Sequence, residues 1–123
     1  MRKVLVPFDG SDNALRGLRY AISLAQENGP IEIHVVFAHD EPDIYGEIGV
    51  YVSREKMANL QRKHGEALLE IAEQVLKEAA VPYTKEILIG NLAETVASRA
   101  DELGCDAIVM GTRGMTAVGS FVL

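Results

Sequence analysis

Short apolar runs alternate with helical patterns along the whole chain. The apolar runs occupy residues 3–8, 31–38, 83–89 and 105–110. The first run is aliphatic with no polar alternation, which is typical of a strand buried on both faces. Strands that alternate with helices in this order predict an α/β fold, with an open parallel sheet, right-handed crossovers and helices on both faces.

The segments between these runs have helical periodicity. Residues 10–13 (Gly-Ser-Asp-Asn) provide a turn and an N-cap for a first helix, which Asn28-Gly29-Pro30 ends. The apolar positions expected to face the core in this helix are Leu15, Leu18, Ile22 and Ala25. A long helix over 54–80 has its expected stripe at Met57, Leu60, His64, Leu68, Ile71 and Val75. A short third helix has Leu92, Val96, Ala100 and Leu103.

The segment 40–52 lacks clear periodicity and contains Pro42, Gly46 and Gly49. It is longer than the usual connection of 2–6 residues in α/β units, and long loops are often functional. Its proline and glycine content fits a lid over a site and plain disorder equally well.

Composition narrows the class of protein. The 123 residues suit a single domain, 1–123. Twelve basic residues against 18 acidic ones give a net charge of −6, which argues against a general binder of nucleic acid or of acidic membranes. No run is long enough for a signal-peptide core or a membrane span, and the single Cys105 suits a reducing compartment. We expect a cytoplasmic, soluble protein.

Two predicted strand ends have the chemistry of a ligand site. Pro7, Phe8 and Asp9 follow the first strand, and Gly111-Thr112-Arg113-Gly114 follows the fourth. Ligands of open α/β sheets bind beyond the carboxyl ends of strands where the strand order reverses. If these two strands are neighbours, Asp9 could accept bonds from ribose hydroxyls or help to hold a metal ion. The glycine loop and Arg113 could then take phosphates, because glycine lets backbone N–H groups approach an anion closely.

Each part of this site has a simpler explanation. Asp9 could cap the first helix, Gly111 and Gly114 could be ordinary turn glycines, and Arg113 could be a solvated surface charge. The conjunction of all of them at the right strand ends is stronger evidence than any one part.

Other chemistries are less well supported. The glycines are not followed by the Lys-Ser/Thr of a P-loop, and the first strand does not lead into G-x-G-x-x-G. His34, His39 and His64 lack metal-ligand spacing, and His64 is expected to pack against the core. No nucleophile or acid–base pair is evident, so we expect no efficient catalysis.

These residues resemble the universal stress protein family over essentially the whole chain. The resemblance rests on residues 4–11, on the Gly90-Asn91 turn and on residues 105–114. In ATP-binding members the signature is Gly-x2-Gly-x9-Gly-Ser/Thr, and Gly111 and Gly114 match its first two glycines. The resemblance implies a Rossmann-like sheet in the strand order 3-2-1-4-5, which puts the first and fourth strands side by side.

The same resemblance implies an adenine-nucleotide site. Pro7 and Asp9 would flank the adenosine, the backbone near Ala38 would meet the adenine edge, and Met110 would line the pocket. The ribose and phosphates would be wrapped by Gly111, Thr112, Arg113, Gly114, Met115 and Thr116. The expected ligand is ATP or AMP, with Mg²⁺ accompanying ATP, in a regulatory protein of the stress response.

The chain departs from the family pattern at its end. Met115 to Leu123 supply the nine spacer residues, and Gly119-Ser120 falls five positions too early to be the closing pair. We therefore expect the closing Gly-Ser/Thr, a fourth helix and a fifth strand to lie beyond the 123 residues, which leaves the fourth strand as a sheet edge. The resemblance implies that the full-length protein forms a homodimer through this fifth strand. Without the closing Gly-Ser/Thr, we expect the 123 residues alone to bind nucleotide weakly or not at all.

Two alternatives of other classes remain open. One is a dimeric interaction module that binds no nucleotide. The other, less well supported, is an adenosine-nucleotide hydrolase.

Overall fold

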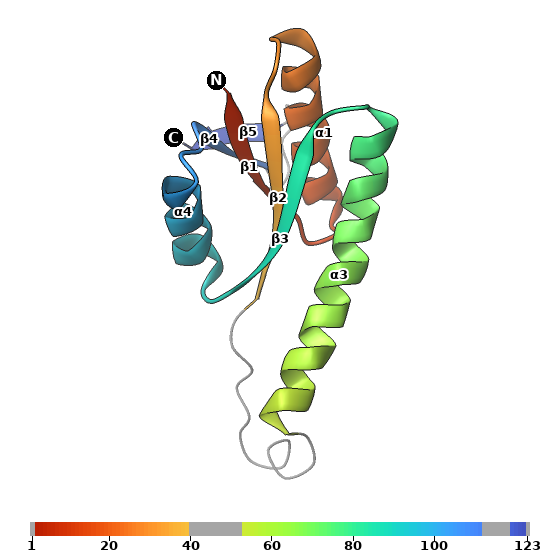
Figure 1. The fold of residues 1–123 in the computed structure, drawn as a ribbon, viewed down its shortest axis with the longest axis vertical. Helices are drawn as coiled ribbons and strands as arrows, with labels where there is room; N and C mark the ends of the chain where they lie inside the picture. The colour runs from red at the N-terminus through yellow and green to blue at the C-terminus, as the bar shows by residue number, and fades with distance from the viewer. Residues whose placement is uncertain (1, 40–52, 112–118, 123) are drawn as a thin grey trace.

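The computed structural model describes residues 2–39, 53–111 and 119–122, and it contains an open sheet with helices on both faces (Figure 1). The strand order is β3-β2-β1-β4-β5, and the pairs β3–β2, β2–β1 and β1–β4 are parallel. The elements in chain order are β1 (Lys3–Pro7), α1 (Asp12–Glu27), β2 (Glu32–His39), α3 (Arg54–Glu78), β3 (Tyr83–Ile89), α4 (Leu92–Glu102), β4 (Ala107–Gly111) and β5 (Gly119–Val122). The predicted α/β class and the order 3-2-1-4 are confirmed.

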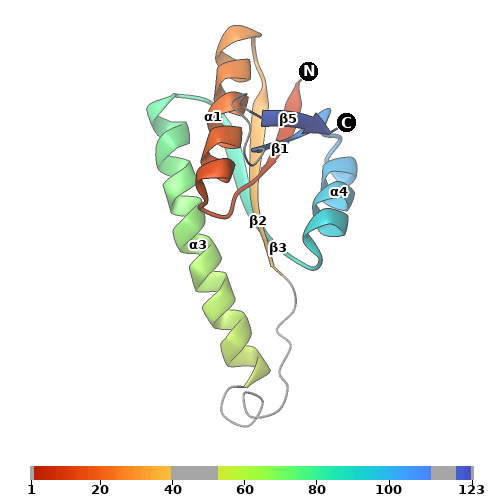
Figure 2. The same ribbon diagram turned by 180° about the vertical axis from the view of Figure 1, so that it is seen from behind.

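Two apolar cores hold the layers together. Helices α1 and α3 cover one face of the sheet and α4 covers the other, as opposite views of the ribbon show (Figures 1 and 2). Alternate residues of β2 point to opposite faces, so Val35 packs in the larger core under α1 and α3, and Val36 in the smaller core under α4. Both valines are fully buried, as expected for a central strand of a parallel sheet.

Helix α1 begins and ends as the sequence predicts. The Ser11 side chain accepts a hydrogen bond from the Ala14 N–H at 3.1 Å, which satisfies one of the donors at the helix start. Asn28 is the C-cap, and Gly29 follows it with a φ of +87°, a left-handed conformation that glycine adopts readily. Because β1 ends at Pro7 and the N-cap of α1 is Ser11, the helix starts beside the carboxyl end of β1.

The buried face of the long helix α3 matches the predicted stripe only in part. Leu68 and Val75 pack, partly buried, against the larger core as expected. The buried residues of α3 are Gly65, Leu69, Ala72 and Leu76. Leu60 and Ile71, both expected in the core, are 56% and 51% exposed. His64 is exposed as well, although its ring makes an edge contact with Phe37 at a centroid distance of 5.8 Å. The physical reason is close packing: a Cβ added at Gly65 would lie 2.6 Å from the Phe37 ring, so the small residues mark the side nearest the sheet.

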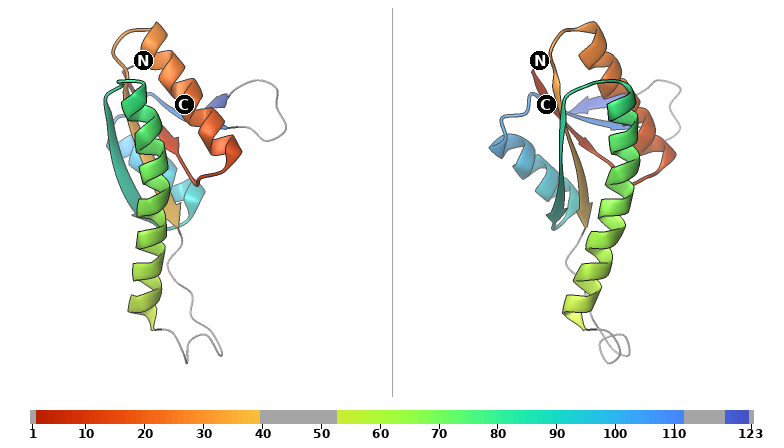
Figure 3. Two further views of the ribbon diagram at one scale, coloured as in Figure 1. Left: turned by 90° about the vertical axis from the view of Figure 1, so that its right-hand side faces the viewer. Right: turned by 45° about the vertical axis from the view of Figure 1, so that its right-hand side comes forward.

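The outer edge of β4 differs from our expectation. It is not left open, because β5 pairs with β4 in antiparallel fashion, with Gly111 opposite Gly119 and Ile108 opposite Val122 (Figure 3). A strand edge presents unpaired N–H and C=O groups, and pairing with a nearby segment satisfies them. The expectation that β4 forms an open sheet edge was therefore wrong. β5 is antiparallel to β4, whereas the fifth strand that the resemblance implies is parallel.

The predicted loop 40–52 lies outside the described residues. Among the helices that the structure describes, none is long and apolar enough to cross a membrane.

Candidate functional site

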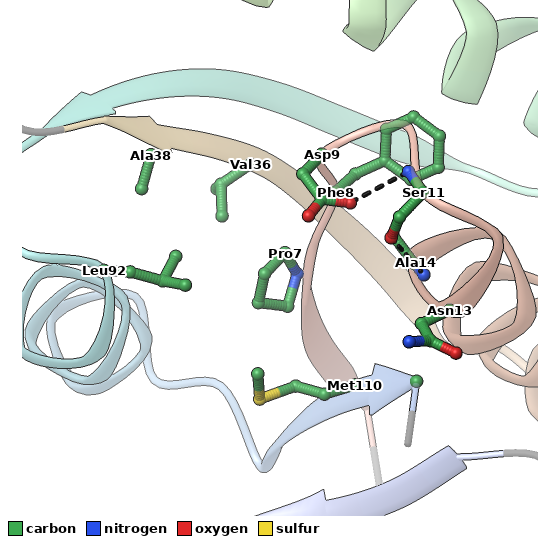
Figure 4. A pocket seen from close by; sticks show the side chains of 11 residues that line it. Pro7, Phe8, Asp9, Ser11, Asn13, Ala14, Val36, Ala38, Leu92 and Met110 are labelled. Atoms are coloured by element: carbon green, nitrogen blue, oxygen red, sulfur yellow. Dashed lines mark hydrogen bonds between the residues drawn. The ribbon is translucent and has the colours of Figure 1, made fainter. Parts of the chain in front are cut away.

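A pocket of about 360 Å³ lies where β1, β2 and β4 end, between the start of α1 and the start of α4 (Figure 4). Because these strands are parallel, their carboxyl ends meet at one edge of the sheet. In the sheet, β2 lies on one side of β1 and β4 on the other. The pocket therefore lies at the point where the order of the strands reverses. This is the usual ligand position in open α/β sheets, and the volume falls within the roughly 300–1,000 Å³ of small-molecule sites.

One end of the pocket is apolar. Figure 4 shows Pro7 in the middle, Val36 and Ala38 above it, Leu92 on one side and Met110 below. Leu92 is 49% exposed and Met110 36% exposed, so both still have apolar surface that a ligand can cover. Such a surface suits a flat, mostly apolar ring system.

The other end is polar and is formed by Asp9, Ser11 and Asn13. Asp9 is exposed, and its Oδ1 accepts a hydrogen bond from the Ser11 N–H at 2.9 Å. Ser11, rather than Asp9, is the N-cap of α1. Since no described residue bonds to Oδ2 of Asp9, that oxygen can accept a hydrogen bond from a ligand hydroxyl or contact a cation.

The first glycine of the predicted loop packs tightly against α1. A Cβ added at Gly111 would collide with the carbonyl oxygen of Asn13, and one added at Gly17 would lie 2.6 Å from the Gly111 nitrogen. Glycine at 17 and 111 therefore lets α1 and β4 meet backbone to backbone at the rim of the pocket. Gly111 thus has a packing role in this fold, alongside any role in binding.

The structure brings together one part of the predicted site. Pro7, Asp9, Ala38, Met110 and Gly111 line the same pocket. The remaining predicted site residues lie outside the described ones: Thr112, Arg113, Gly114, Met115 and Thr116.

Sequence reasoning missed Val36, Leu92 and Asn13 as lining residues. Val36 could have been found, because it lies two positions before Ala38 on one strand and so shares its face. Leu92 was expected in the core as part of a helical stripe, but it stands at the first position of α4, where it reaches the pocket. The sequence predicts Asn13 only as part of the turn and N-cap before the first helix.

The main polar network lies away from the pocket. The buried His34 contacts Thr84 through Nδ1 at 2.6 Å and Glu86 through Nε2 at 2.8 Å, and Arg99 donates to the same Glu86 oxygen at 2.8 Å. Burial alone raises the pKa of Glu86, but the hydrogen bonds from Arg99 and His34 outweigh it, so the pKa lies below its usual value. This network joins β2, β3 and α4 and has a structural role.

Two further observations concern reactive or metal-binding groups. Burial raises the pKa of the Cys105 thiol, which packs beside the smaller core and is therefore held in its unreactive form. Among residues 2–39, 53–111 and 119–122, no group of three or more His, Cys, Asp or Glu side chains is placed to hold a metal ion.

Comparison with known proteins identifies the family. The family model of the universal stress protein family matches residues 1–123. The chain is 37% identical over 128 residues to a curated universal stress protein from Thermus aquaticus, "Universal stress protein in QAH/OAS sulfhydrylase 3'region", and the match covers 99% of this chain and 85% of that relative. The chain belongs to the universal stress protein family, and the predicted family is confirmed.

Solved structures share the fold. A universal stress protein family member from Burkholderia pseudomallei has a TM-score of 0.75 and 26% identity, covering 89% of this chain and 80% of its own. A universal stress protein solved in complex with cAMP has a TM-score of 0.66 and 23% identity, covering 95% and 80%. A family protein from Arabidopsis thaliana, solved with AMP bound, has a TM-score of 0.66 and 18% identity, covering 96% and 81%.

Proposed function

We propose that this chain is a regulatory protein of the stress response that binds ATP or AMP in the pocket between β1 and β4. The observation that carries the proposal is the meeting of Asp9, from the end of β1, with Met110 and Gly111, from the end of β4. These segments are about a hundred positions apart in the sequence, and the parallel β1–β4 pairing brings them together. Membership in a family with AMP and cAMP complexes among its structural neighbours supports an adenine nucleotide.

The two ends of the pocket suggest how the nucleotide would lie. The adenine would rest on the apolar end, between Leu92 and Met110, with its edge near the backbone of Ala38. A ring buried there would remove apolar surface from water at about 25 cal/mol per Å². The ribose would lie toward Asp9, whose Oδ2 would accept a hydroxyl hydrogen bond.

The phosphates would follow the segment from Gly111 to Thr116. Backbone N–H groups of a glycine-containing loop can surround an anion, and Arg113 would add a positive charge. Mg²⁺ would accompany ATP, held chiefly by the phosphates, with the exposed Asp9 as the carboxylate nearest to them among the pocket residues. These assignments, like the boundaries 1–123 of a single nucleotide-binding domain, are part of the proposal.

Three finer expectations rest on the resemblance and on composition. We propose a homodimer, a cytoplasmic location and, at most, slow hydrolysis of ATP. The competing proposal is a dimeric interaction module that binds no nucleotide.

Titration of the 123-residue chain with AMP and with Mg·ATP, followed by amide chemical shifts, tests the proposal. We expect weak, saturable binding, and a clear loss of affinity in Gly114→Ala, because a methyl group there keeps the phosphate from the backbone. Gly29→Ala is the control, since a Cβ at Gly29 meets no atom within 4 Å and the residue is at the far end of α1. Equal affinities in the wild type and in Gly114→Ala would overturn the loop assignment, and absence of any saturable shift would favour the interaction module.

A further inference from the structure

Asn13, in the first turn of α1, lies at the polar end of the pocket in a fixed orientation. Its Oδ1 accepts a hydrogen bond from Nη2 of Arg16, one turn further along the helix. A guanidinium group only donates hydrogen bonds, so the oxygen of the amide must face Arg16. The amide nitrogen, with its two N–H donors, is therefore on the opposite side, and Figure 4 shows it directed toward Pro7 and Met110 across the pocket.

Arg16 is a cation without a described counter-charge. The ion pairs found among the described residues join other side chains, and none includes Arg16. Its Nε atom is buried and has no hydrogen-bond partner among those residues. Arg16 does not line the pocket, so a ligand meets this positive charge only behind Asn13, where the charge favours an anion over a neutral group.

The pocket thus offers opposite chemistry at neighbouring positions. Asp9 presents a carboxylate oxygen, which accepts from a hydroxyl group and repels a phosphate. Asn13 presents amide N–H groups backed by the positive charge of Arg16, and these donate more strongly to a charged phosphate than to a neutral hydroxyl. A ligand with a hydroxyl-bearing sugar and an adjoining phosphoryl group satisfies both positions.

We propose that Asn13 binds the phosphoryl group of the ligand and that Arg16 positions Asn13 to do so, which makes the pocket selective for nucleotides over nucleosides. This inference rests on the proposed function and assigns the source of its phosphate selectivity. Asn13 is the contact residue, and Arg16 is a positioning residue that acts through it.

The variant that tests this assignment is Asn13→Asp. It keeps the shape of the side chain and its bond to Arg16, so the fold is retained, but it replaces the donor in the pocket by a charged acceptor. Dissociation constants for AMP and for adenosine are measured with the wild type, with Asn13→Asp and with the control Asn59→Asp. Asn59 is exposed on α3 and outside this pocket, so its substitution makes the same charge change elsewhere.

We expect Asn13→Asp to weaken AMP binding about tenfold or more, as loss of a hydrogen bond to a charged group implies, while adenosine binding changes by less than about threefold. Arg16→Met should lower the ratio of AMP affinity to adenosine affinity, as Asn13→Asp does. Arg16→Lys, which keeps the positive charge, should lower this ratio less than Arg16→Met. Equal factors for AMP and adenosine in Asn13→Asp would overturn this inference and leave the proposed function standing. A wild type that binds neither ligand would overturn the proposed function and this inference with it.

Discussion

Gly111 of β4 lies directly against the backbone carbonyl of Asn13 in α1, with no room for a side chain between them. This contact fixes the rim of the pocket, because Asn13 lines one side of it and Gly111 another. The strand and the helix therefore set the width of the polar end through backbone contact alone.

Substitution of either glycine at this contact should destabilise the protein. Gly111→Ala introduces a methyl group that overlaps the Asn13 carbonyl, and we expect a loss of about 3 kcal/mol in the free energy of unfolding, the upper end for overpacking. Gly17→Ala should also destabilise, although alanine favours helix by about 1 kcal/mol, because its methyl would lie 2.6 Å from the Gly111 nitrogen.

Urea unfolding measures both effects, with Gly29→Ala as the control. Unlike Gly17 and Gly111, Gly29 has a left-handed φ, and it has no neighbour within 4 Å, so its substitution should cost only the conformational penalty of roughly 1–2 kcal/mol. A Gly111→Ala protein as stable as the wild type would contradict the described contact between α1 and β4.

Leu92 should contribute to ligand affinity and little to stability. It is half exposed at the start of α4, and a bound ring would cover part of its side chain. We expect Leu92→Ala to weaken AMP binding about fivefold, the effect of roughly 1 kcal/mol of lost apolar burial. The matched control is Leu60→Ala on α3, where a leucine of similar exposure lies outside the pocket. If both variants bind AMP as the wild type does, the adenine does not lie on Leu92.

Glu86 should make stability depend on pH. Its pKa in the folded protein is lower than usual, because the bonds from Arg99 and His34 outweigh the opposing effect of burial. A lowered folded pKa stabilises the protein above the pKa of the unfolded chain, and this contribution is lost as the pH falls through the folded value. Glu86→Gln should therefore be less stable than the wild type at neutral pH, and the difference should shrink in acid.

Urea unfolding at pH 7 and near pH 3 checks the Glu86 prediction. Glu102→Gln is the comparison. Glu102 is exposed, and its contact with the network is one of 3.6 Å between its Oε2 and Nη1 of Arg99. A difference between the Glu86 variant and the wild type that stays constant with pH would exclude a charged role for Glu86.

Asp106 should anchor the start of β1 beside β4 in the same pH-dependent way. One of its oxygens accepts hydrogen bonds from the backbone N–H groups of Arg2 and Lys3, at 2.7 and 3.0 Å, and these bonds lower the pKa of Asp106. Asp106→Asn should speed hydrogen exchange at the Lys3 amide at neutral pH, with a smaller effect in acid. Asp101→Asn, on the exposed end of α4, should leave that amide unchanged. Unchanged exchange at Lys3 in Asp106→Asn would rule out the anchor.

The sequence predicts the central strands well because they contain continuous apolar runs, as Val4 to Val6 and Val35 to Phe37 illustrate. It predicts the buried face of α3 less well, because Gly65 and Ala72 share that face with Leu69 and Leu76 and carry almost no hydrophobic signal. Small residues permit close packing, but only the tertiary structure shows which surface they pack against.

The same limit applies to the site. Pro7, Asp9 and Gly111 can be predicted because they lie at or just after the ends of strands, and strand ends of a parallel sheet meet at one edge. The donor role of Asn13 depends on a bond from Arg16, and the pocket role of Leu92 depends on where α4 begins. The antiparallel β5 also escaped prediction, because four residues without a periodic pattern reveal no partner.

The central claim is that the pocket between β1 and β4 holds an adenine nucleotide with its base at the apolar end. The most direct test is to label the methyl groups of methionine and leucine and to record nuclear Overhauser effects to AMP near saturation. We predict contacts from the adenine protons to the Met110 and Leu92 methyl groups, and none to Met57 or Leu60 on α3. Adenine contacts confined to methyl groups other than Met110 and Leu92, or no contacts at any AMP concentration, would contradict the account.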